Sequence, residues 1–248
     1  MPVAAMTALR RTARLEHRLT RPNASLTELA AAVGLVVEHQ LAMLAVSPWL
    51  VKPAAHLLAG TAVRLTAVIG YPHGGQVAAV KAFEASKALE HGATQLDFVL
   101  NAGALVSGDD EAVLNDMLAV VEMAHSALAL SGVIVQAGPL SEELMRRASR
   151  LAARAGADYV VTSTGEDPAA VTIEQAKFLH RAVGEQLEVK AAGTFTDLAQ
   201  VADAVAAGAG RISTSFSAEL AARVTAWLRE PRATAATPPR VDVAATAG

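Results

Sequence analysis

The sequence predicts an α/β protein of the (β/α)8 class, the TIM barrel, in which eight parallel strands alternate with helices. Eight β-rich runs are separated by helical segments, and eight is the number of parallel strands that closes such a barrel. A Gly-Ala pair ends a helix and leads directly into a strand at 92–93, 156–157 and 208–209. Glycine suits these places because it readily adopts the left-handed helix stop. An open doubly wound sheet is the alternative, but no G-x-G-x-x-G opens a helix to support it.

The eight strands are predicted from short apolar and β-branched runs that are bounded by turn residues. In chain order they cover 15–19, 41–48, 63–72, 95–101, 132–138, 158–165, 187–193 and 209–216.

Helical periodicity is clearest in residues 76–92 and 141–156, and the second of these begins at a Ser cap. Apolar residues lie near one face of each helix: Val77, Val80, Phe83 and Ala88 in the first, and Leu144, Met145, Ala148, Leu151 and Ala155 in the second.

Two further helix starts are marked by capping boxes, in which a Ser or Thr is followed three residues later by Glu or Gln. One is Ser25 with Glu28, and the other is Thr172 with Gln175.

The composition fits one large domain. The chain has 248 residues, of which 52% are hydrophobic and 18% charged, so it can bury a sizeable core. We expect a single barrel domain over 1–228 that includes an N-terminal helical segment. The Pro/Ala/Thr-rich end, 229–248, lacks periodicity and is expected to be disordered.

Composition also excludes several function classes. A net charge of −3 argues against a general nucleic-acid surface. The chain contains no cysteine, which excludes disulfides and cysteine metal sites and fits a reducing cytoplasm. No apolar run is long enough to span a membrane, and the start lacks the apolar block of a signal peptide. The sequence therefore predicts a soluble cytoplasmic protein.

The strand 95–101 points one carboxylate into the barrel. Leu96 and Phe98 alternate with Asp97, and the apolar face should pack on helices, so Asp97 faces inward, where it is costly unless paired. Lys190, near the end of the strand 187–193, is the expected partner. Barrel enzymes carry catalytic groups at strand ends, and a buried lysine can be a Schiff-base nucleophile or a proton shuttle. We therefore expect a catalytic pair, with a structural ion pair as the alternative.

Other polar residues near strand ends are weaker candidates. His73 lies in a Gly-rich loop and is otherwise a turn residue. Gln136 interrupts an apolar run and needs a partner, and Glu16 either reaches the mouth or faces solvent. Ser163 and Thr164 bind substrate oxygens or simply end their strand. The seven histidines form neither H-E-x-x-H nor H-x-H, so no metal or other cofactor is predicted.

Several of these stretches together resemble the class I deoxyribose-phosphate aldolases. The resemblance covers residues 15–220 and rests on motifs in a fixed order, which are VIGYPHGG, EHGATQLDFVLNAGALVSGD, AGADYVVTSTG, LEVKAAG and GAGRISTS. It implies a (β/α)8 barrel that cleaves 2-deoxyribose 5-phosphate to glyceraldehyde 3-phosphate and acetaldehyde through a lysine Schiff base, without a metal. Asp97 matches the family's proton-relay aspartate. Lys190 matches the second lysine, which lowers the pKa of the first.

The first lysine, the nucleophile, is absent from its motif. The family form is V-K-T-S-T-G, and this chain reads V-V-T-S-T-G from Val160 to Gly165. Val161 therefore stands where the resemblance places the amine, and it cannot form an imine.

Other departures lie around the phosphate cradle that the resemblance implies. Gly193-Thr194 replaces a Gly-Gly pair, Thr196 replaces an arginine, and the last turn reads Ser213-Thr214-Ser215-Phe216. Glu16, Arg21 and Gln136 stand for aspartate, lysine and glutamate, and Glu166 adds negative charge. We expect these residues to surround the substrate: Glu16, His73, Asn101, Gln136, Val161, Ser163, Thr164, Glu166, Gly193, Ser213, Ser215 and Phe216.

These observations leave three functions open. The preferred one is a repurposed enzyme of specialised metabolism that uses Asp97 and Lys190 on a non-phosphorylated small carbonyl compound. Its reaction is an aldol or retro-aldol step, a cyclisation, a dehydration or an isomerisation, with Lys190 as acid or as a relocated nucleophile. The second is a non-catalytic paralogue that binds a ligand or a partner subunit, and the third is a weak deoxyribose-phosphate aldolase. A small molecule is the expected partner, and a homodimer is compatible with each.

Overall fold

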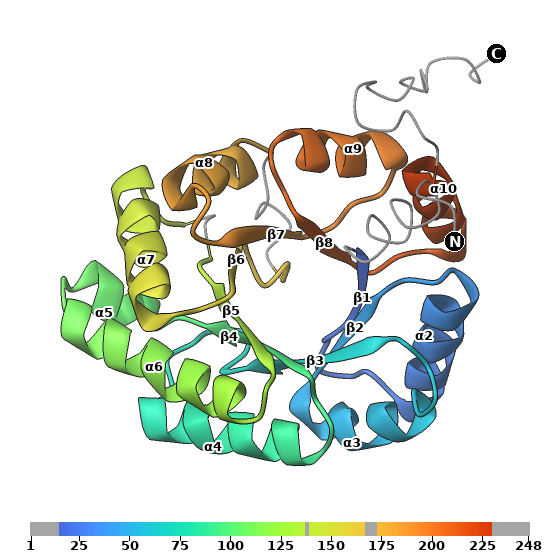
Figure 1. Ribbon diagram of the computed structural model, residues 1–248, viewed down its shortest axis with the longest axis horizontal. Helices are drawn as coiled ribbons and strands as arrows, with labels where there is room; N and C mark the ends of the chain where they lie inside the picture. Colours follow the sequence, from blue (N-terminus) through green and yellow to red (C-terminus); the bar gives the residue numbers. More distant parts are fainter. Residues whose placement is uncertain (1–14, 137–138, 167–172, 230–248) are drawn as a thin grey trace.

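The computed structural model describes residues 15–136, 139–166 and 173–229. Eight parallel strands form a closed barrel in sequence order, β1 to β8, and β8 pairs with β1 to close it. The strands surround the centre and the helices lie outside them (Figure 1). The (β/α)8 prediction is therefore confirmed. The expected N-terminal helical segment before Leu15 and the tail beyond Arg229 lie outside the described residues.

All eight predicted strands are present, and most are shorter than predicted because their mouth ends leave the sheet as turns. The strands are β1 (Leu15–Leu19), β2 (Met43–Val46), β3 (Arg64–Ile69), β4 (Gln95–Val99), β5 (Leu130–Ile134), β6 (Tyr159–Val161), β7 (Glu188–Ala192) and β8 (Arg211–Thr214).

The helices that follow the strands begin and end largely at the predicted signals. The capping box of Ser25 and Glu28 starts the first of them, whereas Thr172 lies outside the described residues. The Gly-Ala stops have positive φ at Gly92, Gly156 and Gly208, as glycine permits. The helices are α2 (Leu26–Glu38), α3 (Pro48–Leu57), α4 (Ala78–Glu90), α5 (Ala102–Val106), α6 (Asp110–Ser126), α7 (Glu142–Ala155), α8 (Ile173–Val183), α9 (Leu198–Ala206) and α10 (Ala218–Arg229).

The main apolar core lies between the barrel and its helices. The stripe predicted on α7 is confirmed, since Met145, Ala148 and Leu151 are buried. None of the helices in the described ranges combines the length and the apolar character that a membrane crossing needs.

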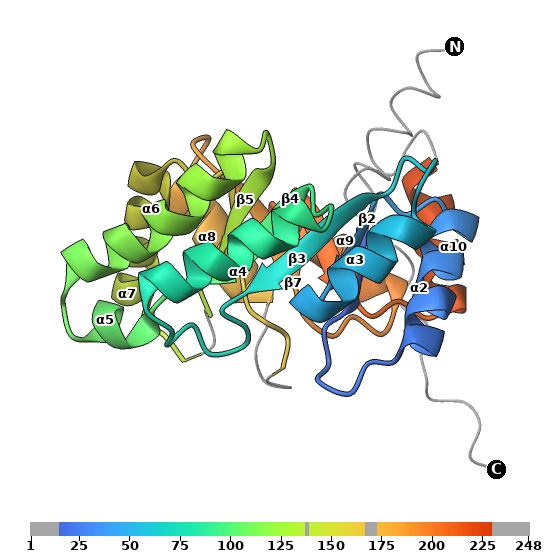
Figure 2. The ribbon, with the colours of Figure 1, turned by 90° about the horizontal axis from the view of Figure 1, so that it is seen from below.

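Of the four residues predicted to face inward in 76–92, Ala88 is buried and the other three are exposed. Val77, Val80 and Phe83 are 69%, 52% and 66% exposed, and α4 turns Lys81 and two alanines inward instead. Lys81 faces inward because its ammonium pairs at 2.7 Å with Asp116 on α6. The helices α4 and α6 lie next to one another along the outside of the barrel (Figure 2).

A second, smaller apolar cluster fills the inside of the barrel on the mouth side. It consists of Val99, Ile134, Tyr159, Val161 and Ala192, from four successive strands, β4 to β7. Gly132 makes room for the ring of Tyr159, because a Cβ at Gly132 would lie 2.0 Å from that ring. The glycine of β5 thus lets a side chain of β6 reach across to β4.

Candidate active site

Lys190 lies at the centre of a buried polar cluster inside the barrel. Its Nζ donates to Asp97 Oδ2 at 2.7 Å and lies 3.0 Å from both carboxylate oxygens of Glu16. Lys190 and Glu16 are fully buried, and Asp97 is 4% exposed. The predicted pair of Asp97 and Lys190 is therefore in contact, and Glu16 joins it as a second carboxylate. Lys190 is the middle residue of β7, so it lies deeper than the strand end predicted for it.

Hydroxyl groups satisfy the remaining carboxylate oxygens. Tyr159 donates to Asp97 Oδ1 at 2.6 Å. Ser213 donates to Glu16 Oε1 at 2.7 Å, and Thr66 donates to Glu16 Oε2 at 2.8 Å. Each of the four carboxylate oxygens accepts at least one hydrogen bond, which is what two buried acids require.

The pKa values of the two carboxyl groups, Glu16 and Asp97, are shifted in opposite directions. Burial disfavours the charge of Glu16, but the Lys190 ammonium and the Ser213 and Thr66 hydroxyls outweigh it, so the pKa of Glu16 is lowered. Burial raises the pKa of Asp97, and the charge of Glu16 adds to this effect. Burial and then the charge of Asp97 raise the pKa of Tyr159 well above its usual range. Glu16 is thus the permanent counter-ion of Lys190, and Asp97 is the acid that accepts a proton more readily.

Val161 lies beside this cluster as a buried apolar residue. It pairs in register with Lys190 on the neighbouring strand and is buried with Val99, Ile134 and Ala192. An isopropyl group therefore occupies this position, and it offers neither a proton nor a nucleophile.

The turn after β6 uses its polar groups internally. Ser163 Oγ donates to the carbonyl of Ala192 at 3.0 Å and accepts from the Gly165 N–H at 3.0 Å. The Thr164 N–H donates at 2.8 Å to the side chain of Gln136, which is the partner that Gln136 was expected to need. These residues hold β6 to β5 and β7.

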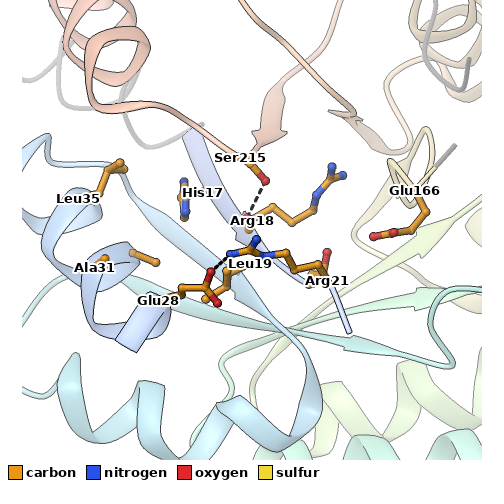
Figure 3. Close-up of a pocket in the computed structure, with 11 residues that line it drawn as sticks. His17, Arg18, Leu19, Arg21, Glu28, Ala31, Leu35, Glu166 and Ser215 are labelled. Atoms are coloured by element: carbon orange, nitrogen blue, oxygen red, sulfur yellow. Dashed lines mark hydrogen bonds and ion pairs between the residues drawn. The ribbon is translucent and has the colours of Figure 1, made fainter. Parts of the chain in front are cut away.

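A cavity of about 470 Å³ lies on the mouth side, between β1, α2 and the turns that follow β6 and β8. Figure 3 shows the Arg18 side chain extending from β1 within this cavity, with Ser215 and Glu166 at its border. Neither Lys190 nor Asp97 lines it. The cavity therefore does not reach the polar cluster.

Two side chains of the mouth, those of Tyr71 and Thr20, were not predicted from the sequence. The Tyr71 hydroxyl lies 2.7 Å from Glu166 Oε1, 2.9 Å from the Thr164 carbonyl oxygen and 3.2 Å from Thr20 Oγ1. Burial raises the pKa of Tyr71. These contacts join the ends of β1, β3 and β6 across the mouth.

Other residues predicted to bind the substrate have contacts within the protein or lie exposed, and their role stays a prediction. Asn101 caps α5 by accepting from the Ala104 N–H, His73 is exposed in its loop, and the Gly193 N–H donates to the Ser213 carbonyl. Ser215 Oγ donates to the Arg18 carbonyl at 2.9 Å.

Phe216 corrects another expectation. Its ring is 4% exposed and belongs to the main core outside the barrel, so it does not crowd the mouth. Ser213 points inward, where its hydroxyl donates to Glu16, and the exposed Ser215 borders the cavity. The Phe216 N–H donates to His17 Nδ1 at 3.1 Å. Burial and then the charge of Arg18 lower the pKa of His17 to about 4.

Among the described residues, no three His, Asp or Glu side chains are grouped as a metal site would require. The two acids of the polar cluster are instead directed at the Lys190 ammonium.

The chain matches the sequence model of a family described as DeoC/LacD family aldolase over residues 6–218. It is 38% identical over 212 residues to a deoxyribose-phosphate aldolase of Geobacillus sp. (strain WCH70), which covers 86% of this chain and 95% of that protein.

Solved structures agree. One described as QR15, an aldolase, has a TM-score of 0.81 at 30% identity and covers 86% of this chain and 94% of its own. Another, described as a unique tetrameric structure of deoxyribose phosphate aldolase from Aeropyrum pernix, has a TM-score of 0.76 at 28% identity. It covers 88% of this chain and 97% of its own.

Proposed function

The chain belongs to the DeoC/LacD family of aldolases, and we propose that it acts within this family on a small non-phosphorylated carbonyl compound without forming a lysine imine. The observation that carries this proposal is the set of hydrogen bonds around Lys190. Its ammonium is hydrogen-bonded to Asp97 and Glu16, and the neighbouring position in register is the apolar Val161. A fully hydrogen-bonded ammonium has no lone pair with which to attack a carbonyl carbon, but it can stabilise an oxyanion.

The proposed step uses the two acids unequally. Glu16 keeps the charge of Lys190 balanced, while the carbonyl oxygen of the substrate takes the place of Asp97 beside Nζ. Asp97 then accepts the proton of a β-hydroxyl group, and the bond between the α- and β-carbons breaks. Its electron pair forms an enolate, whose oxygen the Lys190 ammonium stabilises until a proton returns to the α-carbon. The same groups can serve a dehydration, a cyclisation or an isomerisation.

The absence of phosphate from the proposed substrate is supported by the backbone of the mouth. A phosphate cradle needs free N–H groups, but those of Thr164, Gly165 and Gly193 donate to Gln136, Ser163 and Ser213. The carboxylate of Glu166 also borders the cavity and would repel a dianion. A role in specialised metabolism, a cytoplasmic location and a homodimer belong to the proposal as well.

The test is exchange of α-protons, which reports enolate formation before any product is known. Acetone, pyruvate and acetoacetate are incubated with the protein in deuterated water and followed by proton NMR. We expect faster exchange of at least one of them with the wild-type protein, and none above background with Lys190→Met. Equal exchange with both proteins would remove Lys190 from the chemistry.

A non-catalytic paralogue is the second candidate, favoured by the fact that Lys190 is fully buried and does not line the cavity. It predicts ligand binding at the mouth without any exchange. A weak deoxyribose-phosphate aldolase is the third, favoured by the names of the relatives. We expect negligible cleavage of deoxyribose 5-phosphate. A kcat of about 1 per second or more, which is ordinary for an enzyme, would instead support this third candidate.

A further inference from the structure

We infer that Arg18 makes the mouth selective for carbonyl compounds that also carry a carboxylate, such as 2-oxo and 3-oxo acids. This inference rests on the proposed function for the position of the carbonyl group, which lies at Lys190. The binding of the carboxylate is independent of it and can be measured separately.

The first reason is the position of Arg18. Residues two apart in a strand share a face, so Arg18 points to the same side of β1 as Glu16. It lies two residues closer to the mouth, which corresponds to about 6–7 Å along the strand. Arg18 therefore lies one layer closer to the mouth than Glu16 and its partner Lys190, and it lines the cavity of the mouth.

The second reason is how the guanidinium is held. One of its nitrogens donates to the Thr164 carbonyl at 2.8 Å, and the other lies 3.5 Å from the Gly165 carbonyl. Gly165 permits this approach, because a Cβ there would lie 2.0 Å from the nearer nitrogen. A guanidinium has five N–H donors, so these contacts fix its orientation and leave several donors for a ligand.

The third reason is the lack of a counter-ion. Among the described residues, no carboxylate lies within 4.0 Å of Arg18. Four other arginines do have such partners: Arg21 with Glu28, Arg147 with Asp110, Arg211 with Glu188 and Arg223 with Glu219. Glu166 borders the same cavity but accepts its hydrogen bond from Tyr71. A half-buried guanidinium without an acid is suited to receive one from the substrate.

The fourth reason concerns the kind of anion. The planar fork of a guanidinium matches the two oxygens of a carboxylate. Phosphate is also an arginine ligand, but its second negative charge would be repelled by Glu166, and the backbone N–H groups of Thr164 and Gly165 already have partners. The mouth therefore favours a monoanion.

The experiment measures binding rather than turnover. Pyruvate, acetoacetate, acetone and inorganic phosphate are titrated into the full-length protein by calorimetry. We expect the two oxo acids to bind, acetone to bind far more weakly, and phosphate not to compete with pyruvate. Arg18→Met should weaken pyruvate by about 30-fold, as expected for a hydrogen-bonded charge. Arg147→Met is the matched control, since Arg147 is paired with Asp110 and does not line the cavity, and it should change the affinity less than about twofold.

Unchanged pyruvate affinity in Arg18→Met, acetone binding as tight as pyruvate, or displacement of pyruvate by phosphate would each overturn the inference. If Arg18→Met does not fold, Arg18→Lys decides, because it keeps the charge and loses the fork. It should weaken pyruvate by about fivefold or more, and unchanged affinity would contradict the inference.

The two proposals fail in different ways. Exchange of acetone protons by a protein that binds no oxo acid would overturn the inference and leave the proposed function standing. Arg18-dependent binding of pyruvate with exchange that does not depend on Lys190 would support the inference and overturn the proposed function.

Discussion

Two lysines of this barrel are fully buried, and they differ in what surrounds them. Lys190 lies inside the barrel and Lys81 lies outside its wall, and each pairs with an aspartate at 2.7 Å. Lys81 also donates to the Val99 carbonyl at 2.8 Å, and its partner Asp116 accepts from the Asn101 N–H. This outer pair therefore fixes the end of β4, the strand that carries Asp97.

The charge balance separates the two sites. Lys81 has one carboxylate, and burial moves both partners towards neutrality, since it lowers the pKa of Lys81 and raises the pKa of Asp116. Lys190 has two carboxylates, whose pKa values move apart, down for Glu16 and up for Asp97. Acids with separated proton affinities are typical of acid–base sites. The second carboxylate, more than burial alone, therefore distinguishes the candidate active site from a structural pair.

The largest expected effect is on turnover. Lys190→Met should lower α-proton exchange by about 10³-fold, because the group that stabilises the oxyanion is lost. Lys81→Met, measured on its folded fraction, should stay within a few-fold of the wild type. Comparable losses in the two variants would break the distinction between the two lysines.

The outer pair should dominate stability. Lys81→Met leaves Asp116 buried without a counter-ion and should lower the free energy of unfolding by about 3–5 kcal/mol, measured by urea denaturation. The double variant Lys81→Met with Asp116→Leu should recover much of this loss, because both charges are then removed. If the single variant is as stable as the wild type, the outer pair does not hold β4.

His17 is a buried titratable group that has no carboxylate partner among the residues that the structure describes. Its pKa is lowered from 6.5 to about 4, so the folded protein keeps it neutral while the unfolded chain takes up a proton below pH 6.5. Stability should therefore fall as the pH decreases from 6.5 to 4, by roughly 3 kcal/mol from this residue. His17→Gln, which keeps an acceptor for the Phe216 N–H, should flatten this part of the profile in denaturation measured at several pH values. A parallel profile in both proteins would assign the loss to other groups.

The smallest expected effect concerns the hydroxyl that holds Asp97. Tyr159→Phe removes the 2.6 Å hydrogen bond to Asp97 and should lower exchange by about tenfold, as one charged hydrogen bond suggests. The matched change Tyr71→Phe removes a mouth hydroxyl that does not contact Asp97 and serves as the control. The loss in Tyr159→Phe should depend on pH, because the pKa of Asp97 changes, and a loss of equal size at every pH would indicate a packing defect.

The sequence predicted the parts of this molecule that follow from local periodicity. Alternation in 95–101 placed Asp97 inside the barrel, and the Gly-Ala stops placed the strands. The sequence leaves open whether Glu16 reaches the mouth or faces solvent, because its contact with Lys190 depends on closure of the barrel, which leaves only β8 between β1 and β7. The inward face of α4 could not be predicted either, since a lysine there is stable only with Asp116 opposite. Tyr159 lies two residues before Val161 and Arg18 two residues after Glu16, so strand alternation places both on the inward faces of their strands. The same alternation places Phe216, three residues after Ser213, on the outward face.

The central claim is that Lys190 works as an ammonium and forms no imine. The most direct test is reduction with sodium borohydride in the presence of pyruvate and, separately, acetaldehyde, followed by intact-protein mass spectrometry and peptide mapping. We expect the wild-type protein to gain no adduct, and Val161→Lys to gain one at position 161, because the added amine has Lys190 beside it to lower its pKa. An adduct on Lys190 of the wild-type protein would contradict the claim and make Lys190 a relocated Schiff-base lysine.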